Sequence, residues 1–162
     1  MNASAEAPRQ EIKVAEQVLT FALAGETYGV DILKVREIRG WSSVTPIPHA
    51  PSDVLGVLNL RGAIVPIIDL RTRFGLPPSE RTPLTVIIVL TVERRGRVRD
   101  VGLVVDSVSD VADLKSNDIK QAPEMCNSMG ENQLLGLASV GERMVLLLNT
   151  ETLVCDDSPM SM

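Results

Sequence analysis

Few residues in this chain could carry out chemistry, and those few are poorly placed for it. The chain has one histidine, His49, and two cysteines, Cys126 and Cys155. A serine triad would need His49 as its base, but this residue lies in a loop between Pro48 and Pro51 with no partner nearby in the sequence. The cysteines have no zinc-ligand spacing to each other or to His49. We expect a surface histidine and two reduced thiols.

Two pairs of carboxylates are the remaining candidates for acid–base chemistry. Asp106 and Asp110 are four residues apart with serines between them, and Asp156 is followed by Asp157. Short polar side chains in this pattern are typical of turns and strand edges rather than of catalysis. The sequence contains no phosphate-binding, metalloprotease, nucleophile-elbow or calcium-loop motif. We expect a protein that is not an enzyme and has no cofactor and no bound metal.

The composition sets limits on the class of protein. The 162 residues suffice for one domain, or for two very small ones that share a core. The net charge of −5 and the four aromatic residues disfavour a nucleic-acid binder, which needs basic and stacking side chains. No apolar run approaches the ~18 residues of a membrane span, and the mixed charges of the first 16 residues do not resemble a signal peptide. We therefore expect a cytoplasmic protein.

Hydrophobic patterning predicts short β-strands. Apolar residues alternate from Leu19 to Leu23, and Gly25-Glu26 marks a turn before a return strand. Two further hairpins are expected around Arg61-Gly62 and Gly141-Glu142. The run Val86–Leu90 is wholly apolar, which predicts a strand buried on both faces.

Other segments predict turns, loops and irregular strands. Residues 32–38 fit either a short helical turn or a strand, and Asp69–Phe74 fits one helical turn that ends at Gly75. Pro66 suggests an edge strand or a bulge. The segment Glu93–Asp100 holds four arginines and two acids, which indicates a solvated hairpin tip rather than a basic binding patch.

The strand pattern predicts a mainly β protein. About ten short strands at intervals of roughly 8–12 residues are typical of small barrels or a sandwich. Residues 1–15 are expected to form a flexible leader and residues 155–162 a flexible tail. A mainly β chain without catalytic groups is more often a binding or scaffold module than an enzyme.

Four stretches in order resemble the CheW family, the coupling proteins of bacterial chemotaxis. They are Tyr28–Gly40, Gly56–Arg71, Val104–Val111 and the pair Leu135–Leu137 with Arg143–Leu148. Their order and spacing match over roughly residues 17–153. One such stretch would be modest evidence, but four in order are strong.

The resemblance implies a fold, partners and a location. The fold would be two five-stranded SH3-like β-barrel subdomains packed together with short helical turns, occupying residues 16–154. The protein would be a non-enzymatic adaptor between chemoreceptor (methyl-accepting chemotaxis protein) cytoplasmic tips and the regulatory domain of a CheA-type histidine kinase. It would be recruited from the cytoplasm to membrane-associated receptor arrays, without inserting into the membrane.

The resemblance also implies site residues. The receptor-binding set would be Ile32, Val35, Glu37, Gly56, Arg61, Val101 and Val105, with the apolar members lining a groove between the barrels. The kinase-binding set would be Lys120, Glu124 and Met125. Typical members have Arg, Pro and Phe where this chain has Lys120, Gln121 and Met125, so the lysine keeps the charge but loses the planar guanidinium.

Structural interpretations of these residues stay open beside the functional ones. The valines could be core, Gly56 could serve a strained turn, and Arg61 could pair with Glu37. Alternative functions also stay open: coupling to a non-flagellar kinase pathway, a receiver-fused coupling protein or a kinase regulatory domain on its own, and a small thiol enzyme that uses Cys126 or His49. The length disfavours a fused receiver, because residues after 154 are too few to form one.

Overall fold

The computed structural model describes residues 16–114, 119–120 and 134–153 of the chain. The first strands are β1 (Gln17–Leu23), β2 (Glu26–Asp31), β3 (Val35–Gly40), β4 (Val54–Leu60) and β5 (Ala63–Asp69). They are followed by β6 (Val86–Arg94), β7 (Arg97–Val105), β8 (Ser107–Asp113), β9 (Ile119–Lys120), β10 (Leu134–Val140) and β11 (Arg143–Leu148). The described residues also contain the 3-10 turns η1 (Ile32–Lys34) and η4 (Thr150–Leu153) and one α-helical turn, α1 (Leu70–Arg73).

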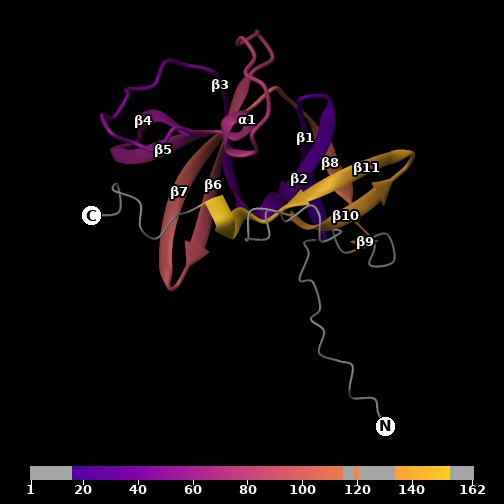
Figure 1. Ribbon diagram of the computed structural model, residues 1–162. Coiled ribbons are helices and arrows are strands. Elements are labelled where there is room, and N and C mark those ends of the chain that lie inside the picture. Colours follow the sequence, from indigo (N-terminus) through magenta and orange to yellow (C-terminus); the bar gives the residue numbers. More distant parts are fainter. Residues whose placement is uncertain (1–15, 115–118, 121–133, 154–162) are drawn as a thin grey trace.

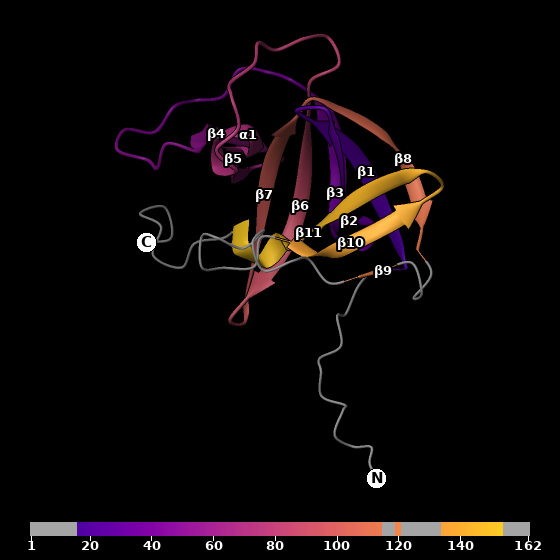
Figure 2. The ribbon, with the colours of Figure 1, turned by 45° about the vertical axis from the view of Figure 1, so that its right-hand side comes forward.

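The strands form two sheets with the same internal pairing. The first sheet has the order β8-β1-β2-β11-β10-β9 and the second has the order β3-β6-β7-β5-β4. In each, two antiparallel pairs are followed by a parallel pair (β2 with β11, β7 with β5) and another antiparallel pair. The two sheets lie on opposite sides of the molecule in Figure 1 and pack against each other in the turned view of Figure 2.

The second sheet is inserted into the first. The chain leaves the first sheet after β2 through η1 and returns to it at Asp106, the single residue between β7 and β8. We call residues 32–105 the second subdomain and the other described residues the first subdomain. The first is therefore built from two separate stretches of chain.

The three predicted hairpins are confirmed at β1–β2, β4–β5 and β10–β11. Residues 32–38 contain both predicted alternatives, a helical turn (η1) and a strand (β3) that follows it directly. The helical turn predicted at 69–74 is α1, capped by the Asp69 carboxylate, which accepts a hydrogen bond from the Arg71 backbone N–H. Of the two alternatives predicted for Pro66, the edge strand is wrong, because β5 lies between β7 and β4. The β4–β5 ladder does shift register beside Pro66, between Val54 and Gly56. Pro66 is tolerated there because β5 pairs with β7 only from Ile67 onward.

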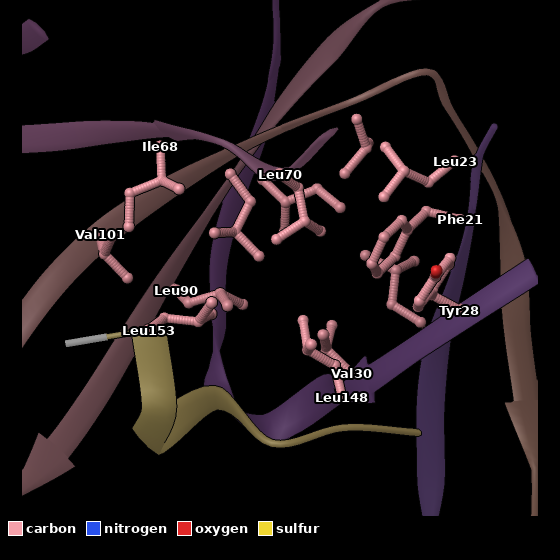
Figure 3. Close-up of a cluster of buried hydrophobic side chains, with 14 of the residues drawn as sticks. Phe21, Leu23, Tyr28, Val30, Ile68, Leu70, Leu90, Val101, Leu148 and Leu153 are labelled. Atoms are coloured by element: carbon pink, nitrogen blue, oxygen red, sulfur yellow. The ribbon is translucent and has the colours of Figure 1, made fainter. Parts of the chain in front are cut away.

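One apolar cluster joins the two sheets, and we call it the central cluster. Its buried members come from both subdomains, as the residues labelled in Figure 3 illustrate. They are Leu19, Phe21, Leu23, Tyr28, Val30, Leu148 and Leu153 from the first, and Ile68, Leu70, Ile88, Leu90, Val92, Val101, Leu103 and Val105 from the second. Neither sheet could bury this face without the other.

Each sheet has a second, smaller cluster on its opposite face. Ile87 and Val89 of β6 pack with Val65 and Ile67 of β5, whereas Ile88 and Leu90 belong to the central cluster. Successive side chains of a strand point to opposite faces, so the run Val86–Leu90 of β6 must be apolar at every position to serve both clusters. This confirms the prediction that the strand is buried on both faces. In the first sheet, Val18, Ala112, Ala138, Val145 and Leu147 form the equivalent cluster.

The fold is mainly β, as the strand pattern predicted, and it forms two small subdomains of related pairing, as the family resemblance implied. The first sheet has six strands rather than five, because the two-residue β9 extends it beyond β10. The tip at 93–100 is confirmed as a hairpin in which Arg94 pairs with Arg97.

Replacing Phe21 with alanine should destabilise both subdomains together. Phe21 is fully buried in the central cluster, and large-to-small changes of this kind typically cost about 3–5 kcal/mol. Chemical denaturation followed by the fluorescence of Trp41, the sole tryptophan, should show one transition at lower denaturant concentration. Met144→Ala is the control, because that side chain is 52% exposed and its loss should change the free energy of unfolding by less than about 0.5 kcal/mol. Two separate transitions would contradict the shared core.

Candidate functional site

Glu37 and Arg61 meet at one edge of the second subdomain. The Arg61 Nη2 donates a hydrogen bond to Glu37 Oε1 at 2.6 Å, and the Arg39 Nη1 donates to Glu37 Oε2 at 3.0 Å. The hydrogen bond from Arg61, followed by that from Arg39, holds the pKa of Glu37 below its ordinary value. The predicted Arg61–Glu37 pair therefore exists. It ties the β4–β5 turn to the edge strand β3, and the Arg61 side chain remains 70% exposed.

Gly56 is required by a close approach of two backbones. Thr45 and Val57 exchange backbone hydrogen bonds of 3.0 and 2.9 Å. A Cβ atom at Gly56 would lie 2.2 Å from the carbonyl oxygen of Thr45. Any larger residue would push the segment before Pro46 away from β4, so the structural interpretation of Gly56 holds whatever else it contacts.

The four apolar residues predicted to line a groove do not share one environment. Val101 and Val105 lie inside the central cluster with 2% and 1% of their surface exposed. Ile32 and Val35 are half-buried and pack against the same cluster from its edge. The structure thus makes Val101 and Val105 core residues and leaves Ile32 and Val35 at the surface.

Leu33 is the residue that the sequence interpretation left out of this surface. It is 88% exposed on the turn η1, between Ile32 and Lys34. The Asp31 carboxylate caps the turn by accepting the Leu33 backbone N–H at 2.9 Å. Leu33 lacked a distinguishing signal in the sequence, because the apolar spacing of residues 32–38 did not separate a turn from a strand.

The kinase-binding set is only partly within the described residues. Lys120 is exposed on β9, which pairs with β10. Glu124 and Met125 lie outside the described residues, as do Cys126 and Cys155.

The residues considered as candidates for catalysis occupy a loop and a contact between strands. His49 is exposed in a loop with a positive φ of 64°. Asp110 accepts a hydrogen bond from the Thr20 hydroxyl at 2.7 Å, which links β8 to β1. The described part of the chain contains no group of three or more His, Cys, Asp or Glu side chains that could hold a metal ion. Nor does it contain a helix long and apolar enough to cross a membrane.

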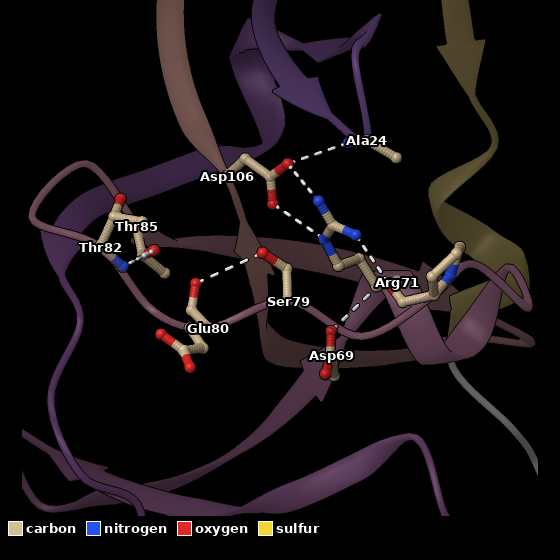
Figure 4. Close-up of polar contacts among 9 residues, drawn as sticks. Ala24, Asp69, Arg71, Ser79, Glu80, Thr82, Thr85 and Asp106 are labelled. Atoms are coloured by element: carbon tan, nitrogen blue, oxygen red, sulfur yellow. Dashed lines mark hydrogen bonds and ion pairs between the residues drawn. The ribbon is translucent and has the colours of Figure 1, made fainter.

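Asp106 links Arg71 to the backbone of Ala24 at the point where the chain returns to the first sheet (Figure 4). Its carboxylate accepts hydrogen bonds from Arg71 Nε at 3.1 Å and Nη2 at 2.8 Å, and from the Ala24 backbone N–H at 2.9 Å. The Arg71 Nη1 also donates to the carbonyl oxygen of Pro77. Arg71 therefore joins α1, the loop after it and the crossing residue Asp106, and Asp106 reaches the β1–β2 turn.

The ion pair between Arg71 and Asp106 is electrostatically favourable. The hydrogen bond from Arg71 is the main cause that lowers the pKa of Asp106, with a smaller contribution from the Ala24 N–H, while partial burial opposes both. A second arginine of α1, Arg73, forms an ion pair with Asp53 at 3.0 Å and donates to the carbonyl oxygen of Thr152 in η4. Arg71 and Arg73 thus fasten α1 to the first subdomain, through Asp106 and Thr152.

Together these features define a class of protein. Two small β subdomains with the same order of strand pairing share one core, and hydrogen bonds from Arg71 and Arg73 hold them together. Their edges are partly apolar. This is the architecture of a binding module. A family model described as "CheW-like domain" matches residues 17–157. The chain belongs to the CheW family.

Individual relatives agree with this assignment. The chain is 45% identical over 144 residues to a chemotaxis protein CheW of Klebsiella aerogenes, covering 89% of this chain and 84% of the relative. It is 37% identical over 114 residues to a chemotaxis protein CheW of Bacillus subtilis, covering 70% of each. The crystal structure of a scaffolding protein CheW from Thermoanaerobacter tengcongensis superposes with a TM-score of 0.72 at 31% identity, covering 84% of this chain and 90% of that one.

Gly56→Ala should destabilise the second subdomain, because the added Cβ collides with the Thr45 backbone rather than with a movable side chain. We expect a free energy of unfolding lower by about 1–3 kcal/mol, the usual cost of overpacking. Gly40→Ala is the matched control, since a Cβ there meets nothing within 4 Å. Equal stability of the two variants in urea denaturation would refute the steric requirement.

Asp106→Asn should weaken the fold at neutral pH and matter less in acid. Hydrogen bonds to a charged group are worth about 1.5–3 kcal/mol, so the variant should lose a stability of that order at pH 7. Because the folded-state pKa lies below the ordinary value of about 3.9, this stabilisation is fully present above that value. It is lost as the pH falls through the folded-state pKa. Urea denaturation of both proteins from pH 7 to pH 3 measures the difference, and a gap that stays constant down to pH 3 would contradict the assignment.

Proposed function

We propose that this protein is a non-enzymatic adaptor that couples chemoreceptor cytoplasmic tips to a CheA-type histidine kinase. The observation that carries the proposal is the family match over residues 17–157. Relatives named as chemotaxis proteins, and a related structure titled a scaffolding protein, support it. Recruitment of the protein to membrane-associated receptor arrays is part of the same proposal.

The receptor surface in this proposal is the edge of the second subdomain next to η1. Leu33 is almost fully exposed there, and Ile32 and Val35 are half-buried beside it. A receptor helix could bury these side chains at ~25 cal/mol per Å² of apolar surface. Glu37 and Arg61 frame this edge with paired charges, and Gly56 keeps the neighbouring backbone in place. Val101 and Val105 lie beneath, as members of the central cluster against which Val35 packs.

The kinase surface in this proposal lies on the first subdomain. Lys120 is exposed on the short edge strand β9, and Glu124 and Met125 follow it in sequence. The receptor and kinase surfaces therefore belong to different subdomains, so one molecule can hold both partners at once.

Coupling requires that binding energies differ between receptor states. A difference of about 1–3 kcal/mol between the two states is enough to shift a kinase equilibrium by 5–150-fold. Because one core links the two subdomains, a change at η1 reaches residues shared with the kinase-bearing subdomain. Weak individual contacts suffice when many adaptors assemble together, since each added contact is then intramolecular.

Val35→Asp should abolish co-sedimentation with receptor cytoplasmic fragments, because it places a charge at the centre of the proposed apolar surface. Lys120→Glu should leave receptor binding intact and reduce only receptor-dependent autophosphorylation of the kinase. The assay mixes the protein with receptor fragments, with and without the kinase, and scores sedimentation and autophosphorylation in the same tube.

Met144→Asp is the matched control, because Met144 is exposed on the other subdomain. It should behave as the unaltered protein in both readouts. Circular dichroism must show that all three variants are folded, and Val35→Ser replaces Val35→Asp if the charge unfolds the chain. Normal receptor binding by folded Val35 variants would rule out this surface, and failure of the unaltered protein to bind matched partners would overturn the proposed function.

A further inference from the structure

The two subdomains carry opposite charge. Residues 32–105 contain eleven Lys and Arg against six Asp and Glu, whereas the first subdomain contains two Lys and Arg against eight Asp and Glu. The acidic balance of the whole chain therefore conceals a basic second subdomain. Charge complementarity favours an acidic partner on this part of the molecule.

A groove of about 660 Å³ opens on the outer face of the β4–β5 hairpin in this basic subdomain. Its apolar wall includes Val57, Ile64 and Pro66 from the hairpin and Ile47 from the loop before β4. Leu58 and Val65 point to the opposite face of the same hairpin and pack with the second sheet's own cluster. Ile64 is 62% exposed, so this wall is available to a ligand.

The groove lies where two parallel strands separate. β5 and β7 pair only from Ile67 with Gly102 to Asp69 with Val104. Before that point, residues 97–101 of β7 pair with β6 on one side, and no strand of the described chain pairs with their other side. An unpaired strand edge offers backbone donors and acceptors to an extended peptide.

One positively charged side chain at the groove has no hydrogen-bond or ion-pair partner among the described residues. Asp100 accepts a hydrogen bond from the Thr91 hydroxyl at 2.8 Å and lies 3.7 Å from the Arg36 Nε, so its charge is already matched. The side chain of Arg99, which lines the groove beside it, makes no hydrogen bond or ion pair with any residue in the described ranges. A guanidinium can hold a carboxylate through two parallel hydrogen bonds.

We propose that this groove binds an extended segment of a partner protein that carries apolar side chains and a carboxylate, the carboxylate pairing with Arg99. The apolar side chains lie against Ile64 and Pro66, and the segment's backbone pairs with the free edge of β7. This site goes beyond the proposed coupling function, since none of its lining residues belongs to the receptor or kinase surface.

The test uses the full chain and three acetylated hexapeptide amides. One alternates valine and glutamate, one alternates valine and lysine, and one is the glutamate peptide with proline at a central position. Titration calorimetry should detect binding of the glutamate peptide only, and its affinity should fall as salt is raised. Amide shifts in NMR spectra should change in residues 47–50, 64–67 and 97–101. Equal binding of the lysine peptide, equal binding of the proline peptide, or shifts confined to another face would overturn the proposal.

Two variants and a matched control locate the charge contact. Arg99→Glu should weaken binding of the glutamate peptide at least about tenfold, and Ile64→Ser at least about threefold, because both side chains line the groove. Arg97→Glu makes the same charge change at an exposed position of the same strand that does not line the groove, and should weaken binding less than twofold. Equal losses from Arg97→Glu and Arg99→Glu would mean general attraction to the basic subdomain and would refute the site. Co-sedimentation of Arg99→Glu with receptor fragments should be unchanged, which separates this proposal from the proposed function.

Discussion

Each sheet of this protein depends on the other for burial of one of its faces. The central cluster takes seven buried side chains from the first subdomain and eight from the second, and Phe21, Leu90 and Leu103 are among those with no exposed surface. Sheets that share a core in this way cannot slide or separate without exposing apolar surface to water. The relative position of the two subdomains is therefore fixed by packing, and the surfaces on each are held in a constant relation.

The polar contacts reinforce this relation at the places where the chain crosses from one sheet to the other. Asp106 is the single residue between β7 and β8, and Arg71 holds it in two hydrogen bonds. Arg73, two residues further along α1, reaches Asp53 and the carbonyl of Thr152. A helix of only four residues has little stability of its own, but its arginines hold the two sheets together. In an adaptor, such rigidity means that the free energy of binding at one surface is not lost in movement between the subdomains.

Much of the fold could be predicted from the sequence because the decisive signals are local. Alternation in β1, the turns at Arg61-Gly62 and Gly141-Glu142 and the unbroken apolar run of β6 each depend on neighbours in the chain. The interior position of Pro66 could not be predicted, since the extent to which β5 pairs with β7 depends on a strand distant in the sequence, where Ile67 meets Gly102. The break between β7 and β8, which lie in different sheets, could not be predicted from neighbouring residues, because the crossing at Asp106 involves Arg71, which is distant in the sequence.

The candidate site was less accessible to sequence analysis. The Arg61–Glu37 pair could be proposed because both residues stand in motifs of the family, and the structure contains it. Whether Val35, Val101 and Val105 are core or surface could not be decided from their types, because valine in a strand serves both. Only the three-dimensional arrangement separates them. The unengaged Arg99 had no sequence signal, since four arginines in a hairpin tip resemble an ordinary solvated surface.

The insertion of one sheet into the other also has a consequence for biosynthesis. As the chain leaves the ribosome, β3 to β7 are complete while β8 to β11 of the first sheet have not yet been made. The β1–β2 hairpin and the second subdomain can form early, but Leu148 and Leu153 join the central cluster only when the last third of the chain arrives. The nascent protein therefore passes through a stage in which the central cluster is incompletely covered, and its folding depends on how quickly β11 and η4 follow.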